Sequence, residues 1–440
     1  MFIPYQLAIA NEPENPVTQT RRWMLRVLYV LIVIGCAMRL YDVWIHNPMD
    51  HLFGDAQGYW DLASKPLEPS PMALFNPPFF QVWLALAQKF VMGLPIPAAA
   101  YAGLMSIVTP WFWYRFLREA TSSRLLAVTG WALLVWLPTW IGIYIHFVPE
   151  TLLLPLLGAS LWASMRADRK RTVPSFIGMV SLWLLAALTS VIALPLGVLS
   201  MLFVFFHHPH KLRSAAWSAL VAILILGPLS YRNQSFVHLW SPFGNGWLPR
   251  IFAESGNRDL VLHLTREGAQ WEYGFTAPGI GKQPLAPLSD WTPSRSGTVH
   301  VYVDLSEGER SWKVESERTT LHGWNLLKMR GENIINVMMG TSSPDDNENY
   351  LSEQLSNASR WIWAPLLLLI VAAAAWRWRD TLARPLLPTL IVAWFFLQAC
   401  SLATINDGRY RKPLEGLLIA QVIIMWDQSR KRTSVPAQNS

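Results

Sequence analysis

Asp55 is the residue best suited to acid–base chemistry, and it lies in the short segment GDAQGY at positions 54–59. If a helix begins near Asp55, its carboxylate and the ring of Tyr59 are four residues apart and share one helix face. A carboxylate that aromatic neighbours partly shield from water can serve as a general base. The competing interpretation is that Asp55 only caps the amino end of a helix, since Gly-Asp often precedes one.

Three cations, Arg409, Arg411 and Lys412, lie close together just before the last apolar run of the chain. A planar guanidinium group can bind phosphate oxygens through two parallel hydrogen bonds. The cluster therefore predicts an anionic ligand such as a phosphate or a pyrophosphate, with Tyr410 beside it. Arg232, at the end of another apolar run, fits either the same role or a pairing with lipid headgroups.

Three further polar residues are candidates to line a substrate pocket together with Tyr59. Asn76 precedes a double proline, which fixes an extended entry and then allows a helix to begin. Glu150 opens an otherwise apolar run, where an ionisable group either reaches the interface or lines a cavity. Asn245 stands in a Gly-Asn-Gly sequence, whose backbone can approach a ligand closely.

The composition indicates where such a site would lie. Of the 440 residues, 52% are hydrophobic, 15% are charged and 24 are tryptophan. Soluble proteins carry about 25% charged residues, and tryptophan is enriched where a membrane meets water. The two cysteines, Cys36 and Cys400, lie in apolar runs and suggest neither a disulfide bridge nor a metal site. We therefore expect an integral membrane protein.

Ten charge-poor runs are long enough, or nearly so, to cross the ~30 Å of hydrocarbon in a bilayer. They are residues 24–45, 96–114, 125–145, 149–165, 174–190, 191–206, 214–230, 361–376, 385–405 and 413–427. Basic clusters between them hold 18 of the 36 lysines and arginines, against six acids on the same side. The positive-inside rule makes that side cytoplasmic. The net charge of +7 is then a consequence of topology and predicts no nucleic-acid partner.

The predicted fold is mainly α, a polytopic transmembrane helix bundle of about ten spans with a small mixed outer domain before the last three. Segment 78–94 carries Gln81, Gln88 and Lys89 and would disturb the charge pattern if it crossed, so we expect an interfacial or re-entrant helix there. The order along the chain is a cytoplasmic tail 1–22, the bundle 23–230 with an outer loop 46–77, the outer domain 231–358, the last three spans 359–428 and a tail 429–440. Within the outer domain, residues 299–304 alternate like a strand and residues 321–339 have helical spacing.

All the candidate residues fall on the predicted outer side. One carboxylate and two cationic sites beside a bilayer suit a phosphate leaving group anchored in the membrane and an acceptor hydroxyl arriving from outside. The sequence contains no nucleotide-binding loop, HExxH, GxSxG or Cys/His metal spacing. The residues therefore predict group transfer at the outer surface.

The order of these motifs resembles that of the multi-spanning glycosyltransferases that use polyprenyl-phosphate-linked sugars, the GT-C class. This class includes protein O-mannosyltransferases and the lipid A aminoarabinose transferase. The resemblance covers about residues 24–250 and 360–427. It rests on Gly54-Asp55 through Tyr59 and Ala63, Asn76-Pro77-Pro78-Phe79, Glu150 before an apolar span, Thr189-Ser190, Tyr231-Arg232-Asn233 with Asn245-Gly246, and Gly408-Arg409-Tyr410-Arg411-Lys412-Pro413.

This resemblance implies that Asp55 is the catalytic base, that transfer inverts the anomeric centre, and that Arg232 with Arg409, Arg411 or both holds the donor phosphate. Relatives often have a second acid where this chain has Ala56, which leaves a divalent metal open; no other cofactor is implied. Relatives also often have a histidine where this chain has Asn76, which weakens a substrate contact at that position.

The implied partners are a polyprenyl-phosphate sugar donor, membrane lipids, and a glycan, lipid or protein acceptor that the sequence does not identify. The short tails and the lack of a retention signal favour a bacterial inner membrane, with the active site facing the periplasm.

Two other classes of function remain open. An enzyme like the O-antigen ligases or polymerases would also use lipid-linked saccharides, but would depend on its large outer loop rather than on Asp55. A lipid-linked-saccharide transporter would place ionisable residues in the middle of several spans. The predicted spans are almost free of charge there, with Arg39 and Asp42 near the outer end of the first span as the nearest exception. A receptor or scaffold would leave the outer cations unexplained.

Overall fold

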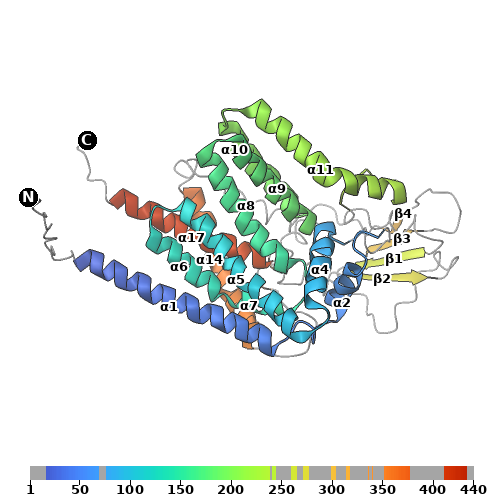
Figure 1. Ribbon diagram of the computed structural model, residues 1–440, viewed down its shortest axis with the longest axis horizontal. Coiled ribbons are helices and arrows are strands. Elements are labelled where there is room, and N and C mark those ends of the chain that lie inside the picture. The colour runs from blue at the N-terminus through green and yellow to red at the C-terminus, as the bar shows by residue number, and fades with distance from the viewer. Residues whose placement is uncertain are drawn as a thin grey trace, which may run out of the picture.

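The computed structural model of the chain describes residues 16–68, 76–237, 240–243, 259–264, 271–276, 299–303, 314–317, 335, 339, 351–376 and 411–433. Within these residues the protein is mainly helical (Figure 1). The helices are α1 (Pro16–Ile45), α2 (Gly54–Ala63), α4 (Pro78–Val91), α5 (Pro95–Ala120), α6 (Arg124–Val135), α7 (Pro138–Gly142), the 3₁₀ helix η1 (Ile143–Ile145), α8 (Glu150–Lys170), α9 (Val173–Thr189), α10 (Ala193–His207), α11 (Lys211–Val237), α14 (Leu351–Trp376) and α17 (Lys412–Thr433). A continuous helix covers each predicted span to within two residues, with two exceptions. Residues 385–405 lie outside the described part of the chain, and 125–145 is divided among α6, α7 and η1.

Two of the described helices are long and apolar enough to cross a membrane: Gln19–Ile45 of α1 and Lys211–Ser235 of α11. The bent pair Arg124–Val135 and Pro138–Ile145, with 58° between its halves, makes a third if it counts as one span. The protein thus has the helices of an integral membrane protein.

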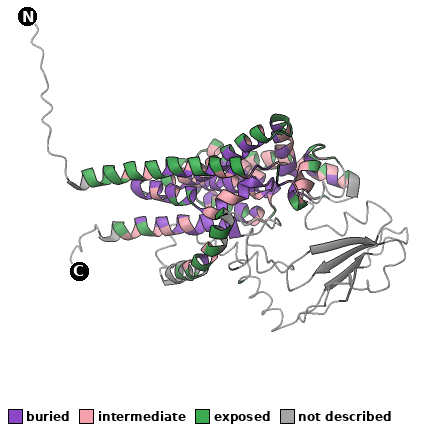
Figure 2. Cartoon of the chain, turned by 90° about the horizontal axis from the view of Figure 1, so that it is seen from below, coloured by how far each residue is buried: buried purple, intermediate pink, exposed green. Residues whose placement is uncertain are grey.

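The exposed face of α1 has the dimensions of a bilayer. Trp23 and Trp44 are 64% and 61% exposed, and the 21 residue steps from one to the other correspond to about 32 Å along a helix. This length matches a hydrocarbon core of ~30 Å with a tryptophan at each boundary. Figure 2 shows that the exposed face extends along α1.

The long helices run between two ends of the bundle. We call the end at which α1 begins and α17 finishes the proximal end (Figures 1 and 2), and the opposite end the distal end. Three contacts between helix ends define the proximal end: Arg124 to the Tyr29 hydroxyl at 3.0 Å, Ser122 Oγ to Asp427 Oδ1 at 2.8 Å, and Arg169 to Glu119 at 2.5 Å. It follows that α1 and α6 run towards the distal end, and that α5, α8 and α17 run back from it.

The break between α6 and α7 is held by a buried arginine of α1. The break follows Val135 because Pro138 cannot continue the helix, which leaves carbonyl groups without their usual partners. Arg39, with no exposed surface, donates from Nε to the Val135 carbonyl at 2.7 Å and from Nη2 to the Leu134 carbonyl at 2.9 Å. Its Nη1 donates to the Trp140 carbonyl at 3.1 Å and to Ser106 Oγ at 2.9 Å. Arg39 is therefore a structural cation.

Helix α17 is attached at its proximal end by Asp427. This buried carboxylate accepts hydrogen bonds from the backbone N–H groups of Ser122 and Ser123, at 3.0 and 3.2 Å, just before α6 begins. It thereby fixes the turn before α6, whose own cap is Ser123, with a side chain that accepts from the Leu126 N–H. Near the other end of α17, a Cβ atom added to Gly416 would lie 2.6 Å from the Trp140 ring, so glycine allows the close approach of α17 to α7.

Helix α4 begins where the double proline predicted, with Pro77 before its first turn and Pro78 as its first residue. Its 14 residues measure about 21 Å, which is less than the thickness of the hydrocarbon. The helix ends at Val91, and the next residue, Met92, adopts the left-handed conformation. This length agrees with an interfacial or re-entrant helix in segment 78–94.

Four strands form one antiparallel sheet in the order β2-β1-β3-β4. They are β1 (Asp259–Leu264), β2 (Trp271–Thr276), β3 (Val299–Val303) and β4 (Val314–Glu317). Representative pairs are Leu262 with Tyr273, Leu262 with Val301, and Tyr302 with Glu315. The strand predicted at 299–304 is confirmed as β3, whereas nearly all of the helix predicted at 321–339 lies outside the described residues.

Candidate functional site

Asp55 lies in the first turn of α2, as a helical residue rather than as its cap. The helix begins at Gly54, whose φ of +52° favours glycine, and the capping position is occupied by Phe53 without a side-chain hydrogen bond. The interpretation of Asp55 as a capping residue is therefore wrong. Its carboxylate is exposed to solvent and is not shielded by aromatic rings as expected. The helix dipole favours a negative charge in this first turn.

Tyr59, one turn after Asp55, packs against α4. Its ring meets the edge of Phe80 at a centroid distance of 5.4 Å. Gln81, buried in α4, donates from Nε2 to the backbone carbonyl of Asn76 at 3.0 Å, and Gln88 donates to the carbonyl of Trp60. The two glutamines that suggested an interfacial helix thus attach α4 to its surroundings.

A cluster of aromatic rings joins this region to the segment after η1. The imidazoles of His51 and His146, both buried, have centroids 5.4 Å apart. Phe147 lies 4.7 Å from Trp60 of α2. Glu150 is half-buried at the first residue of α8, one turn after His146. Asp55, Tyr59 and Glu150 therefore belong to connected elements at the distal end.

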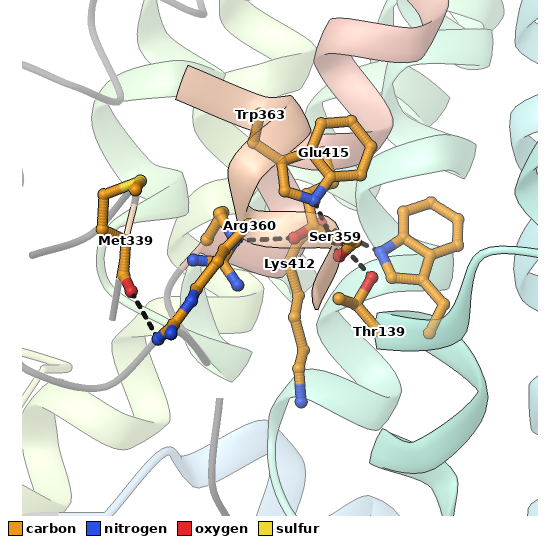
Figure 3. Close-up of polar contacts among 9 residues, drawn as sticks. Thr139, Met339, Ser359, Arg360, Trp363, Lys412 and Glu415 are labelled. Carbon is orange, nitrogen blue, oxygen red and sulfur yellow. Dashed lines mark hydrogen bonds and ion pairs between the residues drawn. The ribbon is translucent and has the colours of Figure 1, made fainter. Parts of the chain in front are cut away.

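The second part of the site is a buried ion pair in the first turn of α17. Arg411 Nε lies 2.8 Å from Glu415 Oε1, and neither side chain is exposed to solvent. Thr139 of α7 donates to the other oxygen of Glu415, and Trp140 Nε1 donates to the Lys412 carbonyl at 2.9 Å. Figure 3 shows Thr139 and Glu415 facing one another, with the side chain of Lys412 extending away from them.

The pairing of Arg411 differs from the expected one. The sequence predicted a guanidinium directed at an anionic ligand, whereas here the carboxylate of Glu415 accepts its Nε–H. The bond fixes the start of α17 and with it the buried Lys412. Arg409, Tyr410 and Asn245 lie outside the described residues.

Arg232 lies near the end of α11 and is half-buried. Its Nε donates to Asn233 Oδ1 at 2.9 Å, and the Asn233 amide donates in turn to the Ser241 carbonyl at 2.6 Å. The Nη1 atom is shielded from solvent and has no hydrogen-bond acceptor among the described residues. The geometry thus orients a guanidinium whose donors are only partly used.

Arg360 of α14 is a further cation that our sequence interpretation did not select. Its Nη1 donates to the Met339 carbonyl at 3.1 Å, and its Cζ lies 5.5 Å from the ring of Trp361. Trp363, one turn further on, is buried and donates to Ser359 Oγ at 3.2 Å (Figure 3). The available signal was an arginine at the boundary of a predicted span: Arg360 directly precedes the run 361–376, just as Arg232 follows the run 214–230.

The carboxylate and the ion pair are connected by packed elements. From Glu415 the contacts run through Thr139 to α7, and then through η1 to His146 and Phe147, which touch the loop before α2 and α2 itself. Among the described residues, no group of three or more His, Cys, Asp or Glu side chains is arranged to hold a metal ion. The arrangement offers an exposed carboxylate and oriented cations at one end of the bundle.

Comparison with known proteins adds no family to this description. The chain matches no protein-family model, no curated protein and no solved structure.

Proposed function

We propose that the protein is a polytopic membrane glycosyltransferase that moves a sugar from a polyprenyl-phosphate donor to an acceptor hydroxyl. The observation that supports this proposal most directly is the placement of Asp55 and the start of α17 at the same end of the bundle, joined by packed side chains. An acid near the beginning of the chain and cations near its end can then act on one substrate.

The proposed topology has about ten spans, an interfacial α4 and an outer domain within 231–358. The proximal end carries the arginines and lysines of the helix ends, among them Arg118, Arg169 and Lys170. By the positive-inside rule this end faces the cytoplasm. The distal end then faces the periplasm of a bacterial inner membrane.

In the proposed reaction Asp55 accepts the proton of the acceptor hydroxyl as its oxygen attacks the anomeric carbon. The bond from that carbon to the donor phosphate breaks, and its electron pair remains on the phosphate oxygen. Attack opposite the leaving group inverts the anomeric centre. Arg232, Arg409 and Lys412 stabilise the charge that develops on the phosphate.

We assign Arg411 chiefly to positioning, because its ion pair with Glu415 holds the first turn of α17 in place. Arg360 is a further candidate for the phosphate. Tyr59, Asn76, Glu150, Asn245 and Tyr410 remain candidates for the substrate pocket.

The structural role of Arg39 also bears on the transporter alternative. A transporter requires ionisable groups within its spans that can exchange partners. The hydrogen bonds of Arg39 reach three carbonyl groups around the α6–α7 break, besides Ser106. This role accounts for one of the two charges that interrupt the first span and supports an enzyme over a transporter.

The test compares sugar transfer by the purified wild-type protein and by Asp55→Asn, with polyprenyl-phosphate sugars as donors. We expect Asp55→Asn to lower turnover by about 10²-fold or more, the usual contribution of a general base, while donor binding is retained. Asp61→Asn is the matched control, because Asp61 is also exposed on α2 and its carboxylate accepts a hydrogen bond from Gln57 of the same helix at 2.7 Å. Wild-type transfer by Asp55→Asn would remove Asp55 from the mechanism.

A further inference from the structure

Two arginines near the proximal end stack on tryptophan. Arg115 follows Trp111 by four residues on α5, and Arg166 follows Trp162 by four residues on α8. The Cζ atom of Arg115 lies 5.6 Å from the ring centre of Trp111 and 5.0 Å from that of Trp162. The Cζ atom of Arg166 lies 5.5 Å from the same Trp162 ring. One indole therefore contacts two guanidinium groups from two packed helices.

These two positive charges have no acid to balance them within the described residues. Neither Arg115 nor Arg166 forms an ion pair or a hydrogen bond there. The acid nearest in sequence on α5, Glu119, lies 2.5 Å from Arg169 instead. The two distances to the Trp162 ring limit the separation of the Cζ atoms to 10.5 Å, which is close to the Debye length of about 10 Å in about 0.1 M salt. An anion placed beside both would relieve their repulsion.

The positions of Arg115 and Arg166 along their helices agree with a site at the membrane surface. Helices α5 and α8 both run towards the proximal end, so each tryptophan lies one helical turn deeper than its arginine. Tryptophan is favoured at the membrane boundary, and a longer cationic side chain extends from there towards the headgroups. The same spacing recurs on α17, where the Cζ atom of Arg430 lies 5.1 Å from the Trp426 ring.

We propose that Arg115, Trp162 and Arg166 form a binding site for the phosphate group of an anionic phospholipid at the proximal surface. Guanidinium groups bind phosphate oxygens through paired hydrogen bonds, and stacking on an indole holds a guanidinium in a fixed plane. A zwitterionic lipid carries its own ammonium group and binds more weakly beside two cations. The site lies at the end of the bundle opposite to Asp55 and does not depend on the proposed glycosyl transfer.

The test measures lipid binding to the purified full-length protein in neutral detergent by native mass spectrometry, with phosphatidylglycerol and phosphatidylcholine as probes. We expect phosphatidylglycerol to bind in preference. The double variant Arg115→Gln/Arg166→Gln should weaken its binding by about fivefold for each arginine, or about thirtyfold in all. The control Lys211→Gln/Arg213→Gln removes the same charge from exposed positions at the start of α11 and should change the affinity by less than about threefold.

A second measurement uses the wild-type chain and is independent of the folding of any variant. A photoactivatable phosphatidylglycerol should label peptides containing residues 111–118 and 162–169 above all others at the proximal end. Equal weakening in the control variant, labelling concentrated elsewhere, or displacement of the lipid by millimolar inorganic phosphate would each overturn the proposal. The last result would identify a site for free phosphate.

Discussion

Replacing Glu415 by glutamine tests whether the ion pair at the start of α17 holds the distal end together. Glutamine keeps the shape of the side chain and an acceptor for Thr139, but it removes the charge opposite Arg411. Both partners are fully buried, so the substitution leaves a guanidinium in the interior without its carboxylate. Removing one partner of a buried pair destabilises proteins by about 3–5 kcal/mol. We expect a loss in this range.

The measurement is the free energy of unfolding in mixed micelles, obtained from tryptophan fluorescence as the fraction of denaturing detergent increases. Glu68→Gln is the control, because the Lys65–Glu68 pair is separated by 3.6 Å and exposed on both sides. Such surface pairs contribute about 0–1 kcal/mol. The double variant Arg411→Met/Glu415→Gln should be more stable than Glu415→Gln alone, because it leaves no uncompensated charge. A loss for Glu415→Gln no larger than that of the control would refute the structural role of the pair.

Three other substitutions test the attachments of α6, α7 and α17 in the same unfolding assay. Arg39→Gln should lower the free energy of unfolding by about 3 kcal/mol or more, since it leaves buried carbonyl groups at the α6–α7 break without donors; a loss below about 1 kcal/mol would contradict this. Asp427→Ala should cost about 1–3 kcal/mol because the backbone N–H groups of Ser122 and Ser123 lose a charged acceptor, and an unchanged midpoint would show that this contact contributes nothing. Gly416→Ala should cost about 1–3 kcal/mol because its Cβ would meet the Trp140 ring, whereas Gly178→Ala, with open space around the added atom, should be neutral or stabilising.

The positions of the helices could be predicted from the hydrophobic runs and from the proline, glycine and polar residues at their ends. The run 174–190 became α9 (Val173–Thr189), and the double proline before residue 79 marked the start of α4. Local sequence specifies such features, because helix ends depend on nearby proline, glycine and polar residues. The break inside 125–145 was not predicted, although Pro138 marks it. Its stabilisation depends on Arg39, which is distant in sequence, and that contact could not be inferred from local pattern.

The candidate site was predicted less completely than the fold. Asp55 was placed in the correct kind of element, but its exposure depends on which rings pack nearby, and those rings turn towards α4 and Phe147 instead. The i, i+4 spacing of Arg411 and Glu415 was visible in the sequence and allows an ion pair on a helix. We assigned Arg411 to a ligand because it belongs to a cluster of three cations just before the last predicted span. In the structure the turn already starts at Arg411 and Lys412.

The contrast between the two parts of the site has a consequence for the proposed reaction. The ion pair of α17 is fully buried, with Thr139 of α7 bonded to Glu415, whereas Asp55 is open to water. The buried Lys412, next to this pair, suits a donor that approaches along the lipid, because it can hold the phosphate while the chain of the donor stays in the membrane. An exposed base suits an acceptor that arrives from the aqueous phase. On this reasoning the two substrates enter from different directions, and α7, which bonds to α17 and continues through η1 towards α2, fixes the distance between them.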